Sequence, residues 1–351
     1  MTDGAKHALI TGIGGQDGIY LARLLLSNGY TVAGIARHTD EIDRRLVPEK
    51  VELVAADVAD RARMRELIAE RQPDEIYNLA SDSFGPRSWD DPLAVGETMA
   101  LATVNILETI RTATPDTRFF QASSSEMFGA PAERPQRETT PLQPRTPYAA
   151  AKTYAHAMVG AYRSRFGVFC CSGILYNHES PLRRAEFVTR KITSSAAAIS
   201  LGLATELRLG NLDVRRDWGF AGDYVRAMWL MLQQEKPDDY VLSAGQTHSV
   251  RDLCDIAFGE VGLDYREFVR YDDRFARPDD VEPFGDSSRA GALLGWRPSV
   301  SFRRLIQAMV AADIERLRGN EMAAIEVALK LQDETADHAA AGPQGGMIDH
   351  A

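Results

Sequence analysis

Cysteine is scarce in this sequence, because the chain of 351 residues has only three. Cys170 and Cys171 are adjacent, and Cys254 lies far from both. This arrangement provides neither the regular spacing of a disulfide framework nor the clustered ligands of a zinc site. We therefore expect free thiols, a reducing cytoplasmic environment and no metal site.

Long apolar runs are also lacking. No stretch reaches the roughly 18 consecutive apolar residues of a membrane-spanning helix. The first residues, MTDGAKHALITG, do not show the basic and then apolar pattern of a secretory signal. We expect a soluble protein with no membrane partner.

Positive charge is deficient, with 40 Lys and Arg against 50 Asp and Glu and a formal net charge of −10. Proteins that bind nucleic acid need Lys and Arg over a whole face to contact the phosphates. This composition argues against a nucleic-acid partner. It remains compatible with a small anionic ligand wherever arginines cluster locally.

Short apolar runs alternate with longer helical patterns through the first half of the chain. The helical segments, such as IYLARLLL, space their apolar residues three and four apart. This alternation predicts βαβ units and an α/β fold with a doubly wound parallel sheet. The predicted strands are residues 7–12, 31–36, 51–58, 75–80, 118–123 and 168–176.

The alternation lapses after about Tyr176, where a polar loop leads into a helical pattern. The amphipathic segment RDWGFAGDYVRAMWLMLQQ predicts a helix over residues 216–234. YVLSAG (240–245) indicates a return to the sheet, and SVRDLCDIAFGEVG (249–262) another helix.

A glycine-rich turn follows the first predicted strand and precedes a helix. In TGIGGQDG, the glycines Gly12, Gly15 and Gly18 are three residues apart. Glycine permits a tight turn and lets phosphate oxygens approach the backbone, where the following helix N-terminus meets the pyrophosphate. The motif predicts a dinucleotide site.

The predicted domains follow from this motif and from the lapse in alternation. We interpret residues 1–176, with returning segments near 212–247, as a dinucleotide-binding domain. Residues 177–211 and 248–318 form a smaller C-terminal substrate region. Residues 319–351 are an extension rich in Ala, Glu and Gly, and we expect its last dozen residues to be disordered.

The second strand is not followed by the Asp or Glu that typically binds the ribose of NAD. It ends in GIARH, and Arg37, with or without His38, can pair with a 2′-phosphate, which favours NADP over NAD. A solvated surface arginine is the alternative. At the end of the third strand, Asp57 and Val58 are candidate adenine contacts, although Asp57 can equally cap the next helix.

Two stretches near the middle of the chain have catalytic character. SSSEMFG (123–129) places Glu126 directly behind a strand, either as a turn residue or as a catalytic acid. In TPYAAAK, Tyr148 and Lys152 are four apart and so share one helix face, where an ammonium group can lower the pKa of the phenol. Because it follows a glycine loop and a Ser-rich strand end, the pair is evidence for a catalytic site.

These stretches together resemble the extended short-chain dehydrogenase/reductases that act on nucleotide sugars, and most of all the GDP-mannose 4,6-dehydratases. The resemblance covers roughly residues 7–318. The motifs that carry it are ITGIGGQDG, QASSSEMFG, PRTPYAAAK, GILYNHESP, FVTRKIT and LGNLDVRRDWGFAGDYVRAMWLMLQQ. The resemblance implies a Rossmann-type fold and a lyase that uses a bound nicotinamide cofactor.

The family's chemistry implies a role for each candidate. Tyr148 would deprotonate the 4-hydroxyl, Lys152 would hold the ribose, and Glu126 would drive the elimination of water. Ser124 would orient the sugar, with Ser125 as a weaker candidate for the elimination. The family pattern also implies cofactor contacts at Gln16, Asp17 and Leu79, in addition to those named above.

Basic residues gather in an otherwise acidic chain and suit a diphosphate. These residues are Arg183, Arg184, Arg190, Lys191, Arg215 and Arg216. Arg183 and Arg184 fit a solvated surface better than Arg216 does, and His178 and Glu179 are expected to be structural. The family pattern implies substrate contacts at Ser83, Asn177, Lys191, Arg216, Arg277 and Asp280.

The sequence departs from the family pattern at two loops. Residues 37–51 are shorter than the family's arm, which leaves open both NADP preference and tetramer assembly. Residues 81–89 add Arg87 near the substrate, which is compatible with another sugar or with epimerisation. A nucleotide-sugar epimerase and a non-catalytic cofactor-binding protein are therefore alternatives. Helices at 93–113 and 148–166 can form a homodimer interface, as in the family.

Overall fold

The computed structural model describes residues 4–81, 85–275 and 283–340. Its centre is a seven-stranded sheet with the order β10-β6-β5-β4-β1-β2-β3, in which all paired strands run parallel. The strands are β1 (His7–Thr11), β2 (Thr31–Ala36), β3 (Glu52–Ala55), β4 (Glu75–Asn78), β5 (Arg118–Ser124), β6 (Cys170–Leu175) and β10 (Asp239–Leu242). The predicted doubly wound α/β sheet is confirmed, and its order reverses direction between β1 and β4.

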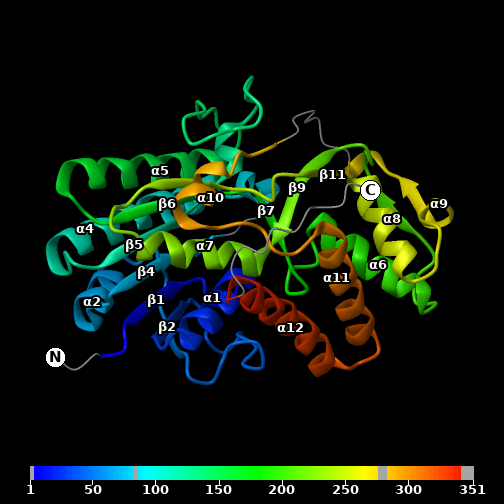
Figure 1. The fold of residues 1–351 in the computed structure, drawn as a ribbon, viewed down its shortest axis with the longest axis horizontal. Coiled ribbons are helices and arrows are strands. Elements are labelled where there is room, and N and C mark those ends of the chain that lie inside the picture. The colour runs from blue at the N-terminus through cyan, green and yellow to red at the C-terminus, as the bar shows by residue number, and fades with distance from the viewer. Residues whose placement is uncertain (1–3, 82–84, 276–282, 341–351) are drawn as a thin grey trace.

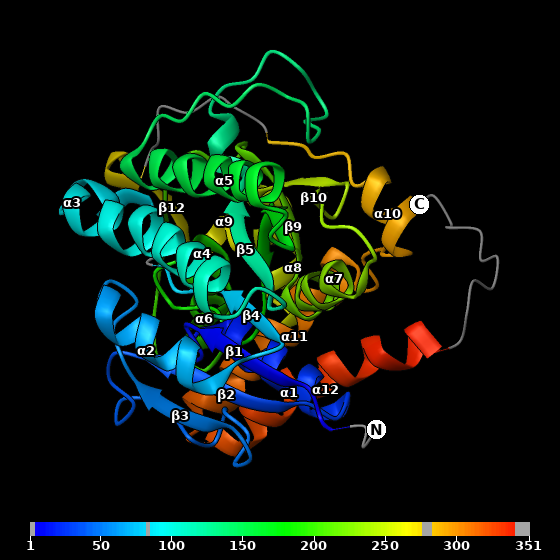
Figure 2. The same ribbon diagram turned by 90° about the vertical axis from the view of Figure 1, so that its left-hand side faces the viewer.

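Helices cover both faces of this sheet (Figures 1 and 2). On one face, α1 (Gln16–Ser27) and α7 (Ala221–Gln233) pack into the largest hydrophobic cluster. On the other, α2 (Arg61–Arg71), α4 (Ala102–Ala113) and α5 (Pro147–Phe166) share a second cluster with the strands. Central strands such as β4 and β6 are buried along their whole length, as expected for a sheet covered on both sides.

One long helix differs from the expectation that no segment is apolar enough to span a membrane. It runs from Pro92 to Ala113 as α3 (Pro92–Val95), η2 (Gly96–Leu101) and α4, after a short turn η1 (Gly85–Trp89). By length and composition alone, this helix could cross a membrane. Less than half of its most apolar window is buried in the structure. Core helices of soluble proteins meet the same criterion, and this one packs against α2 and α5.

The second half builds a smaller region beside the carboxyl ends of the central strands (Figure 1). Its three-stranded sheet places β9 (Arg215–Phe220) between β7 (Asn177–Glu179) and β11 (Thr247–Ser249), and β8 (Leu207–Leu209) pairs with β12 (Val269–Tyr271). The surrounding helices are α6 (Val188–Ser200), α8 (Val250–Glu260), α9 (Tyr265–Phe268), η4 (Asp273–Phe275), α10 (Ser288–Leu294) and α11 (Phe302–Leu317).

The helix predicted over residues 216–234 was wrong at its start. Residues 215–220 form strand β9, and helix α7 begins only at Ala221. Asn177 of β7 and Thr247 of β11 belong to strands that hydrogen-bond to β9 from either side, so the segment pairs with strands distant in sequence. At Gly219, a side chain would meet the Tyr224 ring at 2.5 Å, which fixes the bend between strand and helix.

The C-terminal extension begins with a helix, α12 (Glu321–Ala340), which packs against α11 and α7. Tyr20 of α1 donates from its hydroxyl to the Ala328 carbonyl at 3.2 Å, and Gln332 donates to the Tyr20 carbonyl at 2.8 Å. These bonds attach the extension to the outer side of α1. The tail expected to be disordered lies outside the described residues.

Candidate active site

The glycine turn between β1 and α1 leaves no room for side chains. Gly12 has a φ of +76°, and a Cβ there would lie 2.9 Å from the Ala80 nitrogen. At Gly18, a Cβ would lie 2.6 Å from the Gly12 carbonyl oxygen. Gly15 is the N-cap of α1 and has an extended backbone. The turn is therefore a close-packed cradle at a helix N-terminus, which is the geometry that accepts a pyrophosphate.

The side chains of Gln16 and Asp17 point toward the second region. Gln16 donates from Nε2 to the His178 carbonyl at 2.8 Å and accepts at Oε1 from the Ser180 hydroxyl at 2.8 Å. Asp17 Oδ2 lies 2.8 Å from His178 Nε2. The side chains predicted as cofactor contacts thus join α1 to the start of the substrate region. Because these side chains are engaged, the groups that can bind a phosphate are the backbone N–H groups of the same residues in the first turn of α1.

Three predicted cofactor residues lie at the carboxyl ends of the neighbouring strands. Arg37 is exposed directly after β2, and Asp57 is exposed after β3. Asp57 accepts from the Ala59 N–H at 2.9 Å, whereas the residue that caps α2 is Asp60. Val58 is buried in the core.

A buried polar network lies beneath the glycine turn. The Thr11 hydroxyl donates to Asn78 Oδ1 at 2.8 Å and accepts from the Leu79 and Ala80 N–H groups at 3.1 and 3.0 Å. The amide of Asn78 donates to Gln121 Oε1 at 2.9 Å. This network fixes the position of Leu79, a predicted cofactor contact, relative to the turn.

Tyr148 and Lys152 lie in the first turns of α5. Thr146 caps this helix by accepting from the Ala149 N–H at 3.0 Å, and Pro147 starts it. Both predicted side chains are buried, and Lys152 Nζ lies 5.7 Å from the centre of the Tyr148 ring. Lys152 Nζ also donates to the Ala122 carbonyl of β5 at 2.8 Å. The structure therefore places the pair beside the carboxyl end of β5.

The electrostatics of this pair differ from the prediction. Burial raises the pKa of the Tyr148 phenol, and the nearby Glu126 charge raises it further, while a hydrogen bond with Ser124 and the Arg183 charge lower it. Burial lowers the pKa of Lys152 to about 8. The net shift of the Tyr148 pKa is therefore upward, opposite to the lowering expected from the Tyr148–Lys152 pair, because burial dominates.

Glu126 and Ser124 follow β5 directly. The Ser124 hydroxyl accepts from the Glu126 N–H at 3.2 Å and so caps the short helix η3 (Ser125–Phe128). Ser124 is buried, Ser125 is half-buried and Glu126 is exposed. Since Ser124 bonds to Tyr148 and the Glu126 charge acts on it, the three candidates meet at one place.

The predicted substrate residues lie on elements of the second region. Asn177 is half-buried in β7, and Arg216 is on β9 opposite His248 of β11. Lys191 of α6 donates to the Arg208 carbonyl at 2.7 Å and lies 3.4 Å from the centre of the Phe275 ring. The remaining predicted residues, Ser83, Arg277 and Asp280, lie outside the described residues.

Several members of the basic cluster are engaged within the protein. Arg190 donates from Nε to the fully buried Asp313 carboxylate at 2.6 Å, so it holds α6 against α11. Glu186 lies 2.6 Å from Arg184 and 3.3 Å from Arg87. Arg87 therefore links the turn η1 to the loop that holds Glu186, so a substrate is not its sole partner.

Arg183 and His178 are the residues whose importance sequence reasoning underestimated. Arg183 is mostly buried rather than solvated, because its Nε lies 3.1 Å from the buried Glu179 carboxylate, and its charge reaches Tyr148. His178 is hydrogen-bonded at both nitrogens, to the Tyr176 carbonyl and to Asp17, and it stacks on Tyr224. For Arg183, the signal in the sequence was its position four residues after Glu179, the residue with which it pairs.

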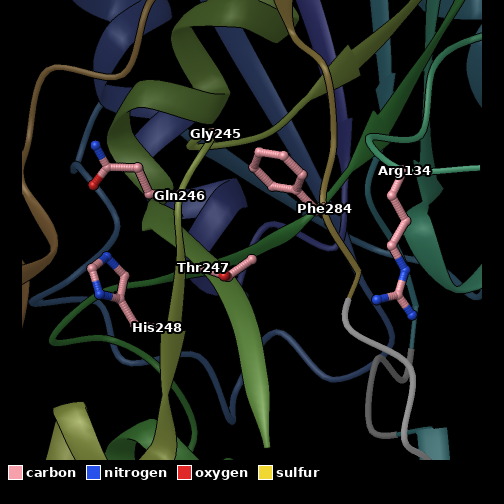
Figure 3. A pocket seen from close by; sticks show the side chains of 6 residues that line it. All are labelled: Arg134, Gly245, Gln246, Thr247, His248 and Phe284. Atoms are coloured by element: carbon pink, nitrogen blue, oxygen red, sulfur yellow. The ribbon is translucent and has the colours of Figure 1, made fainter.

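A cavity of about 410 Å³ lies further along the β9–β11 pair. Figure 3 shows that Phe284 and Arg134 line one side of it, and Thr247 and His248 of β11, with Gln246, the other. Tyr148, Lys152 and Glu126 are not among its lining residues, so the cavity is separate from these three candidates. Among the described residues, no cluster of His, Cys, Asp or Glu is suited to a metal ion.

The sequence of this chain matches a known protein family and its members. The sequence model of the GDP-mannose 4,6 dehydratase family matches residues 9–309. GDP-mannose 4,6 dehydratase 2 of Arabidopsis thaliana is 46% identical over 326 residues, covering 88% of this chain and 87% of that protein. GDP-mannose 4,6-dehydratase of Sinorhizobium fredii is 44% identical over 349 residues, covering 91% and 99%.

Solved structures share the fold at lower identity. The UDP-glucose 4-epimerase of Thermotoga maritima superposes with a TM-score of 0.79 at 20% identity, covering 89% of this chain and 99% of that one. The dTDP-glucose 4,6-dehydratase of Bacillus anthracis gives a TM-score of 0.75 at 20% identity, covering 87% and 96%. With the family match over most of its length, the chain belongs to the GDP-mannose 4,6-dehydratase family of extended short-chain dehydrogenase/reductases.

Proposed function

We propose that this protein is a GDP-mannose 4,6-dehydratase, which removes one water from the hexose of GDP-mannose and yields the 4-keto-6-deoxy sugar nucleotide. The observation that carries the proposal is the meeting of Glu126 and Ser124 with Tyr148 at the end of β5. Oxidation of an alcohol requires only a base such as Tyr148. Elimination of water requires a second acid/base, and Glu126 supplies it.

The site fits a nicotinamide dinucleotide. The cradle at Gly12 and Gly18 admits backbone only, and α1 presents its N-terminus there. A nicotinamide dinucleotide held by this turn and by Lys152 would supply reversible hydride transfer to and from the sugar, so no external reductant would be consumed. We assign residues 1–176, with segments near 212–247, to the cofactor half, and 177–211 with 248–318 to the substrate half.

The residues act in the order that the proton transfers require. Tyr148 takes the proton of the 4-hydroxyl, and Ser124 holds the oxygen that becomes the keto group. The keto group makes the carbon-5 proton acidic, and Glu126 removes that proton. Glu126 then gives a proton to the departing carbon-6 hydroxyl, which leaves as water. The proton that Tyr148 took from the 4-hydroxyl is then available for carbon 5, so the hexose loses one water overall.

The cofactor is NADP rather than NAD in this proposal. Arg37 is exposed at the end of β2, where a 2′-phosphate would lie, and no carboxylate stands at that position. Binding of NADP and NAD by calorimetry tests this assignment. Arg37→Ala is expected to weaken NADP binding about tenfold or more and to leave NAD binding nearly unchanged, since only NADP has the phosphate.

The substrate's nucleotide end is assigned to the second half. Arg216, Lys191 and Asn177 are directed to the diphosphate and its sugar, and Ser83, Arg277 and Asp280 are retained as proposed contacts. The cavity beside Arg134 and Phe284 is the place where the nucleotide can extend.

A homodimer is proposed through the long helix of residues 92–113 and α5. Large hydrophobic side chains are exposed along these elements, namely Leu93, Leu101, Tyr154 and Phe166, and Trp89 of η1 is exposed just before them. These helices contact one another, and exposed large apolar side chains on neighbouring elements are the feature that supports an interface there. The three described cysteines are free and buried, which agrees with a cytoplasmic location.

The experiment that tests the function is incubation of the purified protein with GDP-mannose and analysis of the sugar nucleotide by mass spectrometry. Loss of one water is expected. An isomer of the same mass would instead support the epimerase, because that reaction shares Tyr148 and Lys152 but eliminates nothing. No change with any sugar nucleotide would favour a non-catalytic protein.

A further inference from the structure

The catalytic lysine shares its hydrogen-bond acceptor with a glutamine of β5. The Ala122 carbonyl accepts from Lys152 Nζ at 2.8 Å and from Gln121 Nε2 at 3.1 Å. Gln121 and Lys152 are both buried, so neither side chain can exchange its partner for bulk water. The position of this carbonyl therefore determines where the ammonium group lies.

The other end of Gln121 is held by the network beneath the glycine turn. Gln121 Oε1 accepts from Asn78 Nδ2 at 2.9 Å and lies 3.1 Å from the Thr103 hydroxyl. Asn78 in turn accepts from Thr11, the residue before Gly12. All these side chains are buried. One continuous set of hydrogen bonds thus runs from the cofactor cradle to Lys152.

The donors and acceptors fix the orientation of each amide in this set. The Thr11 oxygen accepts two backbone N–H groups, so its single proton must point to Asn78 Oδ1. The Asn78 amide nitrogen then faces Gln121 Oε1, and the Gln121 amide nitrogen faces the Ala122 carbonyl. No other assignment satisfies all the groups, so Gln121 has only one productive orientation.

We propose that Gln121 is a positioning residue for Lys152, which it holds in register with the cofactor cradle through the Ala122 carbonyl. The inference rests on the proposed function, because it concerns the site of that reaction. Gln121 touches neither substrate nor cofactor in this proposal. Its effect is indirect, because it acts through the position of Lys152. A misplacement of about 1 Å in a catalytic group can lower the rate about 100-fold.

Two substitutions separate this role from a merely structural one. Gln121→Met keeps the length of the side chain and removes every hydrogen bond. Gln121→Glu keeps the acceptor for Asn78 but replaces the donor to Ala122 with a carboxylate near the ammonium group. Gln332→Met is the matched control, because Gln332 is also a buried glutamine with side-chain and backbone bonds, to Arg23 and Tyr20, but lies in α12.

The measurements are kcat and KM with GDP-mannose and the titration of Lys152 by NMR of ¹³C-labelled lysine. The chain has six lysines, so Lys152 can be assigned by its absence in a Lys152→Arg spectrum; they are Lys6, Lys50, Lys152, Lys191, Lys236 and Lys330. Gln121→Met is expected to lower kcat about 100-fold with KM within about threefold. Gln332→Met should retain kcat.

Gln121→Glu is expected to raise the pKa of Lys152 and to move the alkaline limb of the pH–rate profile upward with it. Unchanged kcat in Gln121→Met would overturn the proposal. If Gln121→Met does not fold, an unmoved Lys152 titration in Gln121→Glu would overturn it instead. The NMR titration needs no turnover, so an inactive wild type would refute the proposed function while the lysine titration still tests Gln121.

Discussion

The His178 imidazole lies 2.8 Å from the Asp17 carboxylate, and this contact joins the first turn of helix α1 to strand β7. The other ring nitrogen lies 2.8 Å from the Tyr176 carbonyl, so both nitrogens have acceptors when the ring is protonated. Helix α1 and strand β7 are thus connected by an ion pair that exists only when the imidazole is protonated.

This pair predicts a pH dependence of stability. Burial lowers the pKa of His178, but the Asp17 charge and its hydrogen bonds outweigh burial and raise the pKa overall. A raised folded-state pKa stabilises the protein below the unfolded value of about 6.5, and the contribution is lost as pH rises through the folded value. His178→Gln should therefore destabilise the protein by about 2 kcal/mol at pH 6 and by less at pH 9.

Thermal unfolding of wild type and His178→Gln across this range gives the measurement. Asp17→Asn is the partner variant and should show the same loss at low pH. A stability difference that is equal at pH 6 and pH 9 would contradict the charged pair.

The glycine turn predicts a position-specific effect of added methyl groups. Gly18→Ala would place a Cβ 2.6 Å from the Gly12 carbonyl and 2.7 Å from the Ile13 backbone, so the turn must move. We expect a loss of about 1–3 kcal/mol in stability and loss of cofactor binding. Gly259→Ala in α8 is the control, because no atom lies within 4 Å of its Cβ and it should stabilise by about 0.5 kcal/mol. Equal cofactor affinities in the two variants would contradict the proposal that the glycine turn binds the cofactor.

The strands could be predicted because their signal is local. The runs at 31–36 and 118–123 are short and mostly apolar, and the observed strands β2 and β5 match them within a residue. Strand β9 was missed because Trp218 and Phe220 continue directly into the apolar pattern of α7. Only its pairing with β7 and β11, which are distant in sequence, separates it from the helix.

The contrast between local signals and pairing with distant residues applies to the candidate site as well. Tyr148 and Lys152 could be predicted because they lie one helical turn apart. The partner of Asp17 could not, because His178 is 161 residues away, and the partner of Arg190 is Asp313, 123 residues away. A sequence indicates which side chains are charged, but burial and distant partners decide which remain directed at a ligand.

Glu126 gives a prediction about partial reactions. Glu126→Gln removes the acid/base of the elimination but leaves Tyr148 and the cofactor site in place. We expect kcat to fall by about 10²–10⁴ and the reduced nicotinamide to accumulate during the first turnover. Its near-ultraviolet absorbance measures this directly. Glu133→Gln, in the following loop, is the control and should turn over normally. Fast loss of water in Glu126→Gln would remove Glu126 from the mechanism.

The proposed role of Lys152 predicts that function and stability oppose each other at this residue. Burial lowers its pKa from 10.5 to about 8, so the folded protein holds a charged lysine at neutral pH at a cost of about 3 kcal/mol, at about 1.4 kcal/mol per pKa unit. Lys152→Met removes this cost and loses the bond to Ala122, which is worth about 1 kcal/mol. We expect an inactive protein that is more stable by about 2 kcal/mol at pH 7.

The pH dependence of that gain identifies its cause. Because the folded-state pKa is depressed, the unfolded chain binds more protons between pH 8 and about 10.5, and wild-type stability rises through this window. The advantage of Lys152→Met should therefore be full below pH 8 and shrink toward pH 10.5 in urea denaturation. A constant advantage would attribute the gain to packing, whereas a loss of stability at pH 7 would mean that the hydrogen bond to Ala122 outweighs the burial of the charge.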